Sequence, residues 1–353
     1  MTQVTPSHRE QFDTYTLTDN RNPLFLCGDA ADVLAELPDS SIDCCMTSPP
    51  YWGQREYNNG GIGLEQTPEE YIFGILTVFS QIKRVLKDSG SLWLNLGDTY
   101  VNKCLTGLPW RVAITLMDHQ QWIMRNDVVW NKIKGPDNSQ DKLRNNHEYL
   151  FHFVKQPKEY YYDVNAIRSK PREAKIKNGA VVSATGVTGV RYKRQIELST
   201  SLTSDEKENA FKALNAILEQ VAKGQISDFR MVIRNQQRIT HSDSKKLSGR
   251  AKELAQKGYY FLKYHPDGSK PGDVWDIVPE DTQKREEHYA AYPTDLCRIP
   301  ILATCPPNGI VLDPFCGTGT TNLVALFLER KSIGIDISQK YIDMASQRCR
   351  RLL

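Results

Sequence analysis

A glycine-containing turn between an apolar strand and an apolar helix constrains the fold of this chain more than any other stretch. The apolar residues 309–312 end at Asp313, Gly317 and Gly319 follow in the turn, and residues 323–328 are again apolar. Glycine adopts backbone conformations that other residues avoid, and the start of a helix presents free N–H groups. A strand, a glycine turn and a helix in this order therefore predict a nucleotide-binding α/β fold with a parallel sheet.

A second acidic strand end supports this interpretation. Residues 332–335 form another apolar run, which ends at Asp336, roughly at the spacing at which a carboxylate binds ribose hydroxyls. The dinucleotide fingerprint requires a third glycine where this chain has Asn322. The pattern thus disfavours a dinucleotide and favours a smaller adenosyl ligand.

A proline-rich turn near the N-terminus is the second unusual stretch. The apolar run 42–46 predicts a short buried strand, and Ser48, Pro49, Pro50 and Tyr51 follow it. Proline has no N–H, so the carbonyls and the serine hydroxyl of this turn are free to accept hydrogen bonds, and the tyrosine adds a flat aromatic face. Such a row of acceptors suits a nucleobase with an exocyclic amino group, although a Pro-Pro turn with a hydroxyl N-cap explains the same four residues.

The remaining pattern alternates between strands and helices. Asp29 ends the apolar run 24–27, and its carboxylate is equally well explained as a ligand-binding group or as the N-cap of a helix over 31–37. Thr67 and Pro68 open a helix to about residue 86, with acidic residues in the first turn. Strands are predicted at 91–96, 128–130 and 149–154, and helices at 107–117, 203–224 and 293–305.

Cysteine and histidine placement argues against disulfides and metal. The eight cysteines include no Cys-x-x-Cys pair and lie mostly in apolar runs, and His147 and Glu148 are interpreted as a hydrogen-bonded pair. Residues 1–10 are polar, and no apolar run approaches the roughly 18 residues that cross a bilayer. We expect a reduced, cytoplasmic enzyme without zinc.

The positive charge is concentrated in one segment. Residues 164–270 hold 21 Lys and Arg against 10 Asp and Glu, a balance of +11, so with a net charge of +3 for the whole chain the remainder carries −8. Arg230, Arg234 and Arg238 recur every four residues, which predicts a helix with one basic face. We expect contacts to nucleic acid from this segment. The candidate residues are Arg191, Lys193, Arg194, Arg230, Arg234, Gln237 and Arg238.

Taken together, these motifs resemble the S-adenosylmethionine-dependent amino DNA methyltransferases that modify cytosine N4 or adenine N6. The family's catalytic tetrad is similar to residues 48–51, and its Phe-x-Gly-x-Gly cofactor motif is similar to Phe315, Gly317 and Gly319. The catalytic motif precedes the cofactor motif with a basic segment between them, which resembles the β group, including the N4-cytosine enzymes of type II restriction-modification systems. The likeness covers most of the chain outside residues 164–270.

The resemblance implies a fold and an organisation. The fold would be a Rossmann-like α/β methyltransferase sheet in circularly permuted order, with a mostly helical inserted target-recognition domain. Residues 1–163 would be the first part of the catalytic domain, 164–270 the target-recognition insertion, and 271–353 the second part with the cofactor motif.

The resemblance also implies residue roles. Ser48, Pro49, Pro50 and Tyr51 would be catalytic, with the serine hydroxyl and the Pro49 carbonyl orienting the target amino group and the tyrosine stacking on the flipped base. No metal is implied. Residues that would contact S-adenosyl-L-methionine are Asp336 at the ribose, Asp29 near the adenine, Thr294 at the methionine carboxylate, and Asp313, Phe315, Gly317 and Gly319 around the methionine portion.

The target base follows from the first catalytic position. In the family, serine there is associated with N4 of cytosine and aspartate with N6 of adenine, so Ser48 favours cytosine. C5 methylation requires a cysteine, commonly in a Pro-Cys dipeptide that this chain lacks. The expected enzyme is a site-specific DNA methyltransferase acting on double-stranded DNA, as a monomer or homodimer, with any cognate restriction endonuclease acting separately.

Three other interpretations stay open from the sequence. One is the same enzyme acting on adenine N6. Another is a non-catalytic DNA-binding protein with a methyltransferase-like core, against which the intact motifs argue. The third is a small-molecule methyltransferase, for which the basic segment has no evident use.

Overall fold

The computed structural model describes residues 6–53, 61–133, 139–169, 173–177, 180–182, 189–235, 249–280 and 292–351. The chain divides into two compact units. Unit 1 comprises residues 1–166 and 272–353, and unit 2 comprises residues 167–271. Each unit has its own buried apolar core.

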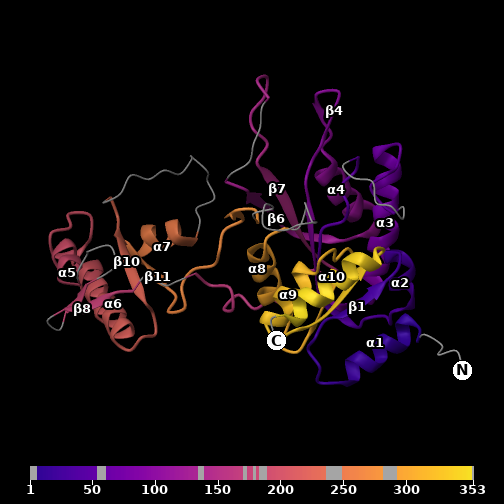
Figure 1. The fold of residues 1–353 in the computed structure, drawn as a ribbon. Coiled ribbons are helices and arrows are strands. Elements are labelled where there is room, and N and C mark those ends of the chain that lie inside the picture. Colours follow the sequence, from indigo (N-terminus) through magenta and orange to yellow (C-terminus); the bar gives the residue numbers. More distant parts are fainter. Residues whose placement is uncertain are drawn as a thin grey trace, which may run out of the picture. The chain divides into compact units, whose positions relative to one another are not determined.

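Unit 1 is built on an eight-stranded sheet (Figure 1). The strands, in spatial order, are β1 (Leu24–Cys27), β14 (Lys331–Asp336), β13 (Ile310–Asp313), β2 (Ile42–Thr47), β3 (Leu86–Leu96), β7 (His147–Val154), β6 (Ile123–Asn131) and β12 (Val274–Asp276). Only β7 runs antiparallel to its neighbours in this sheet. The strand order reverses between β13 and β2, and open α/β sheets bind ligands at the carboxyl edge of such a switch point.

Helices cover both faces of the sheet (Figure 1). Successive residues of β2 show the alternation, because Cys45 faces one core and Cys44 and Met46 face the other. On the first face lie α1 (His8–Leu17), α2 (Ala30–Glu36), α3 (Pro68–Val85) and α4 (Leu108–Gln120). On the second lie α8 (Thr294–Thr304) and α9 (Thr320–Phe327), with α10 (Gln339–Arg350) packed beside α9.

Several predicted elements are confirmed. The helix predicted to begin at Thr67 is α3, where the Thr67 hydroxyl accepts from the Glu70 N–H and the Glu70 carboxylate accepts from the Thr67 N–H. A short hairpin, β4 (Tyr100–Val101) and β5 (Cys104–Leu105), precedes α4. No helix in the described part of the chain combines the length and apolar character that a membrane span needs.

Unit 2 packs helices against a two-stranded hairpin. It contains β8 (Lys175–Lys177), β9 (Ala180–Val182), α5 (Gly189–Glu197), α6 (Ser204–Ala222), β10 (Asp228–Ile233), α7 (Gly249–Lys257) and β11 (Tyr259–Tyr264). The helix predicted from Thr203 is α6, and its capping box is present.

The basic helix predicted around Arg230 and Arg234 is wrong. Residues 228–233 form β10, which pairs antiparallel with β11. Phe229, Met231 and Ile233 enter the core of unit 2 while Arg230 is exposed, which is the two-residue period of a strand. The four-residue spacing of the arginines therefore carried less information than the alternating apolar residues between them.

Candidate active site

The predicted site residues of unit 1 meet at one edge of the sheet. Strands β2, β3, β13 and β14 are parallel, so their carboxyl ends share this edge. Strand β7 is antiparallel, so its first residues lie at the same edge. The glycine turn and the proline turn, separated by more than 250 residues in the chain, are therefore brought to neighbouring strands.

The glycine turn is held by the carboxylate at the end of β14. The Gly317 N–H donates to Asp336 Oδ2 at 3.0 Å, and the Ser338 N–H donates to Oδ1 at 2.9 Å. Burial raises the pKa of Asp336, while these two hydrogen bonds lower it. Asp336 thus fixes the turn to the neighbouring strand and stands where a bound nucleoside would meet both.

Gly319 has no room for a side chain. It caps α9 with a φ of +75°, and a Cβ built on it would lie 2.9 Å from the Cβ of Ala345 and 3.3 Å from the ring of Phe25. Both the left-handed backbone and the close approach of α10 therefore require glycine.

Asp313 joins the two halves of the site. Its buried carboxylate accepts from the Thr47 hydroxyl at 2.7 Å, the Thr321 hydroxyl at 2.7 Å, the Tyr292 hydroxyl at 3.0 Å and the Phe315 N–H at 3.2 Å. Burial raises the pKa of Asp313 and these four bonds oppose the rise. Because Thr47 directly precedes the proline turn, Asp313 links that turn to the glycine turn.

The other predicted cofactor residues lie on the elements around this edge. Asp29 caps α2, accepting from the Ala31 N–H at 2.9 Å, and the preceding Gly28 N–H donates to the carbonyl of Asp336 at 3.0 Å. Thr294 is the first residue of α8 and is half-buried. Phe315 is half-buried against the core on the first face.

The proline turn places Ser48 and Tyr51 in a polar cluster. The Ser48 hydroxyl donates to the Tyr51 hydroxyl at 3.3 Å, and the Tyr51 hydroxyl donates to Glu148 Oε2 at 2.7 Å. Burial raises the pKa of Tyr51 well above its ordinary value, and the adjacent Glu148 raises it further. The expectation that all the turn carbonyls are free is wrong for Pro50, whose carbonyl accepts from the Tyr71 hydroxyl at 3.0 Å.

Sequence reasoning missed three members of this cluster. Asn95 Nδ2 donates to the Tyr51 hydroxyl at 2.9 Å and to Glu148 Oε2 at 2.8 Å, and Lys132 Nζ lies 2.5 Å from Glu148 Oε1. Glu148 is therefore not the partner of His147 that the sequence suggested. Its signal was positional, because Asn95 ends β3 and Glu148 begins β7 at the edge that carries Ser48.

Cysteines and metal ligands add nothing to this site. All eight cysteines are free thiols. Among the residues with described coordinates, no group of three or more His, Cys, Asp or Glu side chains is arranged for a metal ion.

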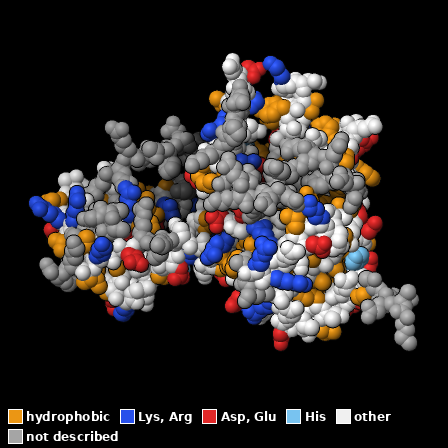
Figure 2. All heavy atoms as spheres, viewed as in Figure 1, with side chains coloured by type: hydrophobic (Ala, Val, Ile, Leu, Met, Phe, Trp, Pro, Cys, Tyr) orange, Lys and Arg blue, Asp and Glu red, His pale blue; other side chains and the backbone are white. Residues whose placement is uncertain are grey.

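The predicted DNA contacts of unit 2 divide into three groups. Arg191, Lys193 and Arg194 are exposed on α5 around the buried Tyr192, and Arg230 is exposed on β10. Gln237 and Arg238 lie outside the described residues. Figure 2 shows basic side chains at several places on the visible face of this unit, with acidic and apolar ones between them.

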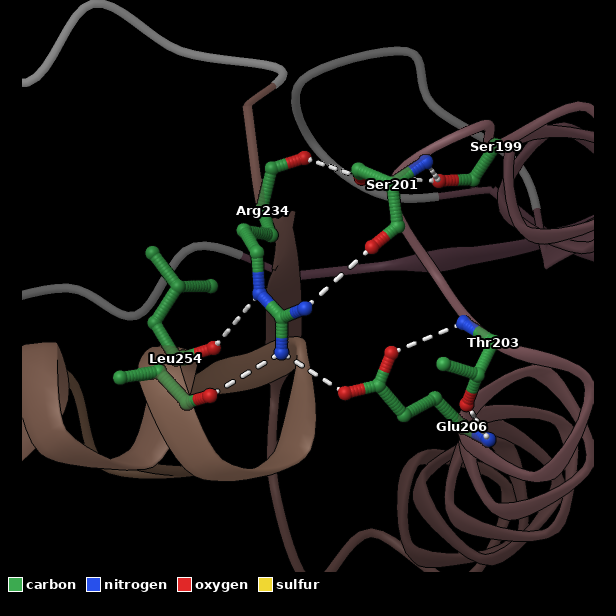
Figure 3. Close-up of polar contacts among 7 residues, drawn as sticks. Ser199, Ser201, Thr203, Glu206, Arg234 and Leu254 are labelled. Atoms are coloured by element: carbon green, nitrogen blue, oxygen red, sulfur yellow. Dashed lines mark hydrogen bonds and ion pairs between the residues drawn. The ribbon is translucent and has the colours of Figure 1, made fainter.

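Arg234, in contrast, is used inside unit 2 (Figure 3). Its guanidinium donates to Glu206 at 2.7 Å, to the carbonyls of Leu254 and Ala255 near the end of α7, and to the carbonyl of Ser201. These bonds satisfy helix-end carbonyls and an acidic partner. We therefore assign Arg234 a structural role and withdraw it as a DNA contact.

Comparison with known proteins identifies the family. Residues 42–347 match the model of the N6_N4_Mtase family, described as DNA methylase. The chain is 26% identical to the type II methyltransferase M.SmaI of Serratia marcescens, over 98% of each protein, and 28% identical to M.Cfr9I of Citrobacter freundii, over 91% of this chain and 85% of that protein.

Solved structures show the same fold. The PvuII DNA methyltransferase, whose name describes it as cytosine-N4-specific, matches with a TM-score of 0.50 and 19% identity over 93% of this chain and 86% of that one. TTHA0409 of Thermus thermophilus, a DNA modification methylase solved in complex with S-adenosyl-L-methionine, matches with a TM-score of 0.50 and 18% identity over 93% and 95%. With the family model matching from β2 to α10, this chain belongs to the N6/N4 DNA methylase family.

Proposed function

We propose that this DNA methyltransferase transfers the methyl group of S-adenosyl-L-methionine to the N4 amino group of a cytosine flipped out of duplex DNA. The observation that carries the proposal is Ser48, a hydroxyl acceptor in a Pro-Pro-Tyr turn, joined through Thr47 and Asp313 to the glycine turn of a nucleotide site. The cytosine-N4 specificity in the name of the PvuII relative agrees with serine at this position.

The glycine turn fits an adenosyl cofactor. Gly319 leaves space that a Cβ would fill, and Thr318 Oγ1 beside it is buried with no hydrogen-bond partner among the described residues. Asp336 would hold the ribose and Asp29 the adenine end, while Thr294, Phe315 and Gly317 would surround the methionine portion. When bound, the cofactor supplies an electrophilic methyl group on a sulfonium.

Residues 48–51 would activate the target nitrogen by orientation. The amino nitrogen of cytosine is conjugated with the ring and is a poor nucleophile. Hydrogen bonds from its N–H groups to the Ser48 hydroxyl and the Pro49 carbonyl would direct its lone pair toward the methyl group. The ring of Tyr51 would stack on the flipped base, and Pro50 would hold the turn rigid.

Unit 2 would serve as the target-recognition part. The exposed Arg191, Lys193, Arg194 and Arg230 would hold phosphates or base edges of duplex DNA. The names of the relatives as type II methyltransferases support a role in a restriction-modification system, with the endonuclease acting as a separate protein.

A product assay tests the proposal. The protein is incubated with mixed-sequence duplex DNA and labelled S-adenosyl-L-methionine, the DNA is digested to nucleosides, and the methylated nucleoside is identified by mass spectrometry. We expect N4-methylcytosine, and Ser48→Ala is the control that should abolish it. N6-methyladenine would overturn the base assignment, and no methylated nucleoside would favour a non-catalytic DNA-binding protein.

A further inference from the structure

The polar cluster at the proline turn has a fixed direction. Glu148 is a carboxylate, which in its ionised form only accepts hydrogen bonds. The Tyr51 hydroxyl has one proton and commits it to Glu148 Oε2 at 2.7 Å. Its oxygen must then accept from its other neighbours, and the Ser48 hydroxyl donates to it at 3.3 Å. Each hydroxyl therefore points its proton toward Glu148.

Other side chains hold the carboxylate in this role. Lys132 Nζ lies 2.5 Å from Oε1, and Asn95 Nδ2 donates to Oε2 at 2.8 Å. Glu148 has only 9% of its surface exposed, so the cationic partner is what favours its ionised form. Burial also raises the pKa of Tyr51, which keeps that hydroxyl protonated and able to donate.

The backbone just after β3 makes room for this arrangement. A Cβ built on Gly97 would lie 2.8 Å from Cε2 of Tyr51 and 3.2 Å from Oε1 of Glu148. Any larger residue at position 97 would push the tyrosine and the carboxylate apart. The same glycine therefore serves both members of the pair.

The direction matters for the substrate. A free serine hydroxyl can donate or accept, and one that points its proton at an amino nitrogen would occupy the lone pair that must attack the methyl group. When the only proton of Ser48 is committed to Tyr51, its lone pairs are what it offers to a target N–H. This point rests on the function proposed above.

We propose that Glu148 is a positioning residue that acts through Tyr51 to fix the Ser48 hydroxyl as a hydrogen-bond acceptor for the target amino group. It does not touch the reacting atoms and takes no proton from them. Residues adjacent to Glu148 in the chain do not indicate this role, because it depends on the antiparallel direction of β7.

Glu148→Gln tests the proposal, because the amide keeps the size of the side chain but can donate to Tyr51 and reverse the direction. We expect the single-turnover rate of DNA methylation to fall about 10- to 100-fold, the scale of a misoriented reacting group. Affinities for S-adenosyl-L-methionine and DNA should stay unchanged. Glu69→Gln, which breaks an exposed ion pair with Arg111, is the matched control and should keep the wild-type rate.

Tyr51→Phe provides the second arm, because it keeps the aromatic ring and removes the linking hydroxyl. We expect a similar loss, and the double variant with Glu148→Gln should be no slower than Tyr51→Phe alone, since both act on one chain of hydrogen bonds. If Glu148→Gln does not fold, Tyr51→Phe alone decides by its rate.

The outcomes separate this inference from the function on which it rests. Wild-type protein that methylates no DNA would refute the proposed function. Wild-type protein that methylates DNA, together with a normal rate in Glu148→Gln or Tyr51→Phe, or with multiplicative losses in the double variant, would overturn the role of Glu148. A loss of cofactor affinity equal to the loss of rate would also overturn it, because it would show a merely structural role.

Discussion

Replacement of Asp313 tests whether one buried carboxylate joins the two turns of the active site. Asp313→Ala removes the acceptor of four donors: the hydroxyls of Thr47, Thr321 and Tyr292 and the N–H of Phe315. The Tyr292 and Thr321 hydroxyls already share a hydrogen bond and can satisfy each other. The Thr47 hydroxyl and the Phe315 N–H are then left without this acceptor.

The expected loss of stability follows from these two donors. A buried donor without a partner costs about 1–3 kcal/mol, which gives about 4 kcal/mol for two. The substitution also removes the cost of burying a carboxylate, whose pKa burial raises. We expect the free energy of unfolding of unit 1 to fall by about 3 kcal/mol, and the midpoint of its thermal transition by about 5–10 °C.

Asp313→Asn is the matched comparison. It keeps an acceptor oxygen for Thr47 and Phe315, and its amide can donate to the hydroxyl oxygens of Tyr292 and Thr321. Calorimetry and guanidinium unfolding should therefore order the proteins as wild type, then Asn, then Ala. An alanine variant as stable as wild type, or an asparagine variant as unstable as alanine, would refute the reasoning.

Three further predictions concern other parts of the molecule. Burial lowers the pKa of His152 from 6.5 to about 3, so between these values the unfolded chain binds a proton that the folded chain refuses. Stability should fall by up to about 1.4 kcal/mol per pH unit below pH 6.5, and His152→Phe should remove that part of the slope in urea unfolding at a series of pH values. Arg234→Met should lower the thermal midpoint of unit 2 without changing the salt dependence of DNA binding, whereas Arg194→Met should keep the midpoint and reduce the salt slope by about 0.9. Ser48→Ala should abolish methyl transfer while sparing binding of S-adenosyl-L-methionine, and Asp336→Ala should weaken that binding; calorimetric titration checks both, and equal effects on binding would contradict the division of roles.

Local patterns predicted the elements that carry the two turns. Asp313 and Asp336 each end an apolar run, and the structure places them at the ends of adjacent parallel strands. The proline turn likewise follows the buried strand that its apolar run predicted. These features depend on neighbours in the sequence, which is why residue patterns were enough.

The polar cluster around Tyr51 was beyond such reasoning. Asn95, Lys132 and Glu148 come from three strand ends, and they meet only because β7 enters the sheet antiparallel between β3 and β6. Arg234 failed for a related reason, because its partner Glu206 lies 28 residues away on another element. Long-range pairing decides both cases, and a single sequence does not display it.

The order of the strands has a consequence for synthesis of the protein. Strands β13 and β14 lie between β1 and β2 in the sheet, although they are the last strands to be made. A nascent chain that ends before residue 310 thus holds two sheet fragments with unpaired facing edges, a costly long-range closure still to come. The centre of the sheet is filled last, and the same step brings the glycine turn beside Ser48. A newly made molecule would therefore gain its fold and its capacity to modify DNA in one late event.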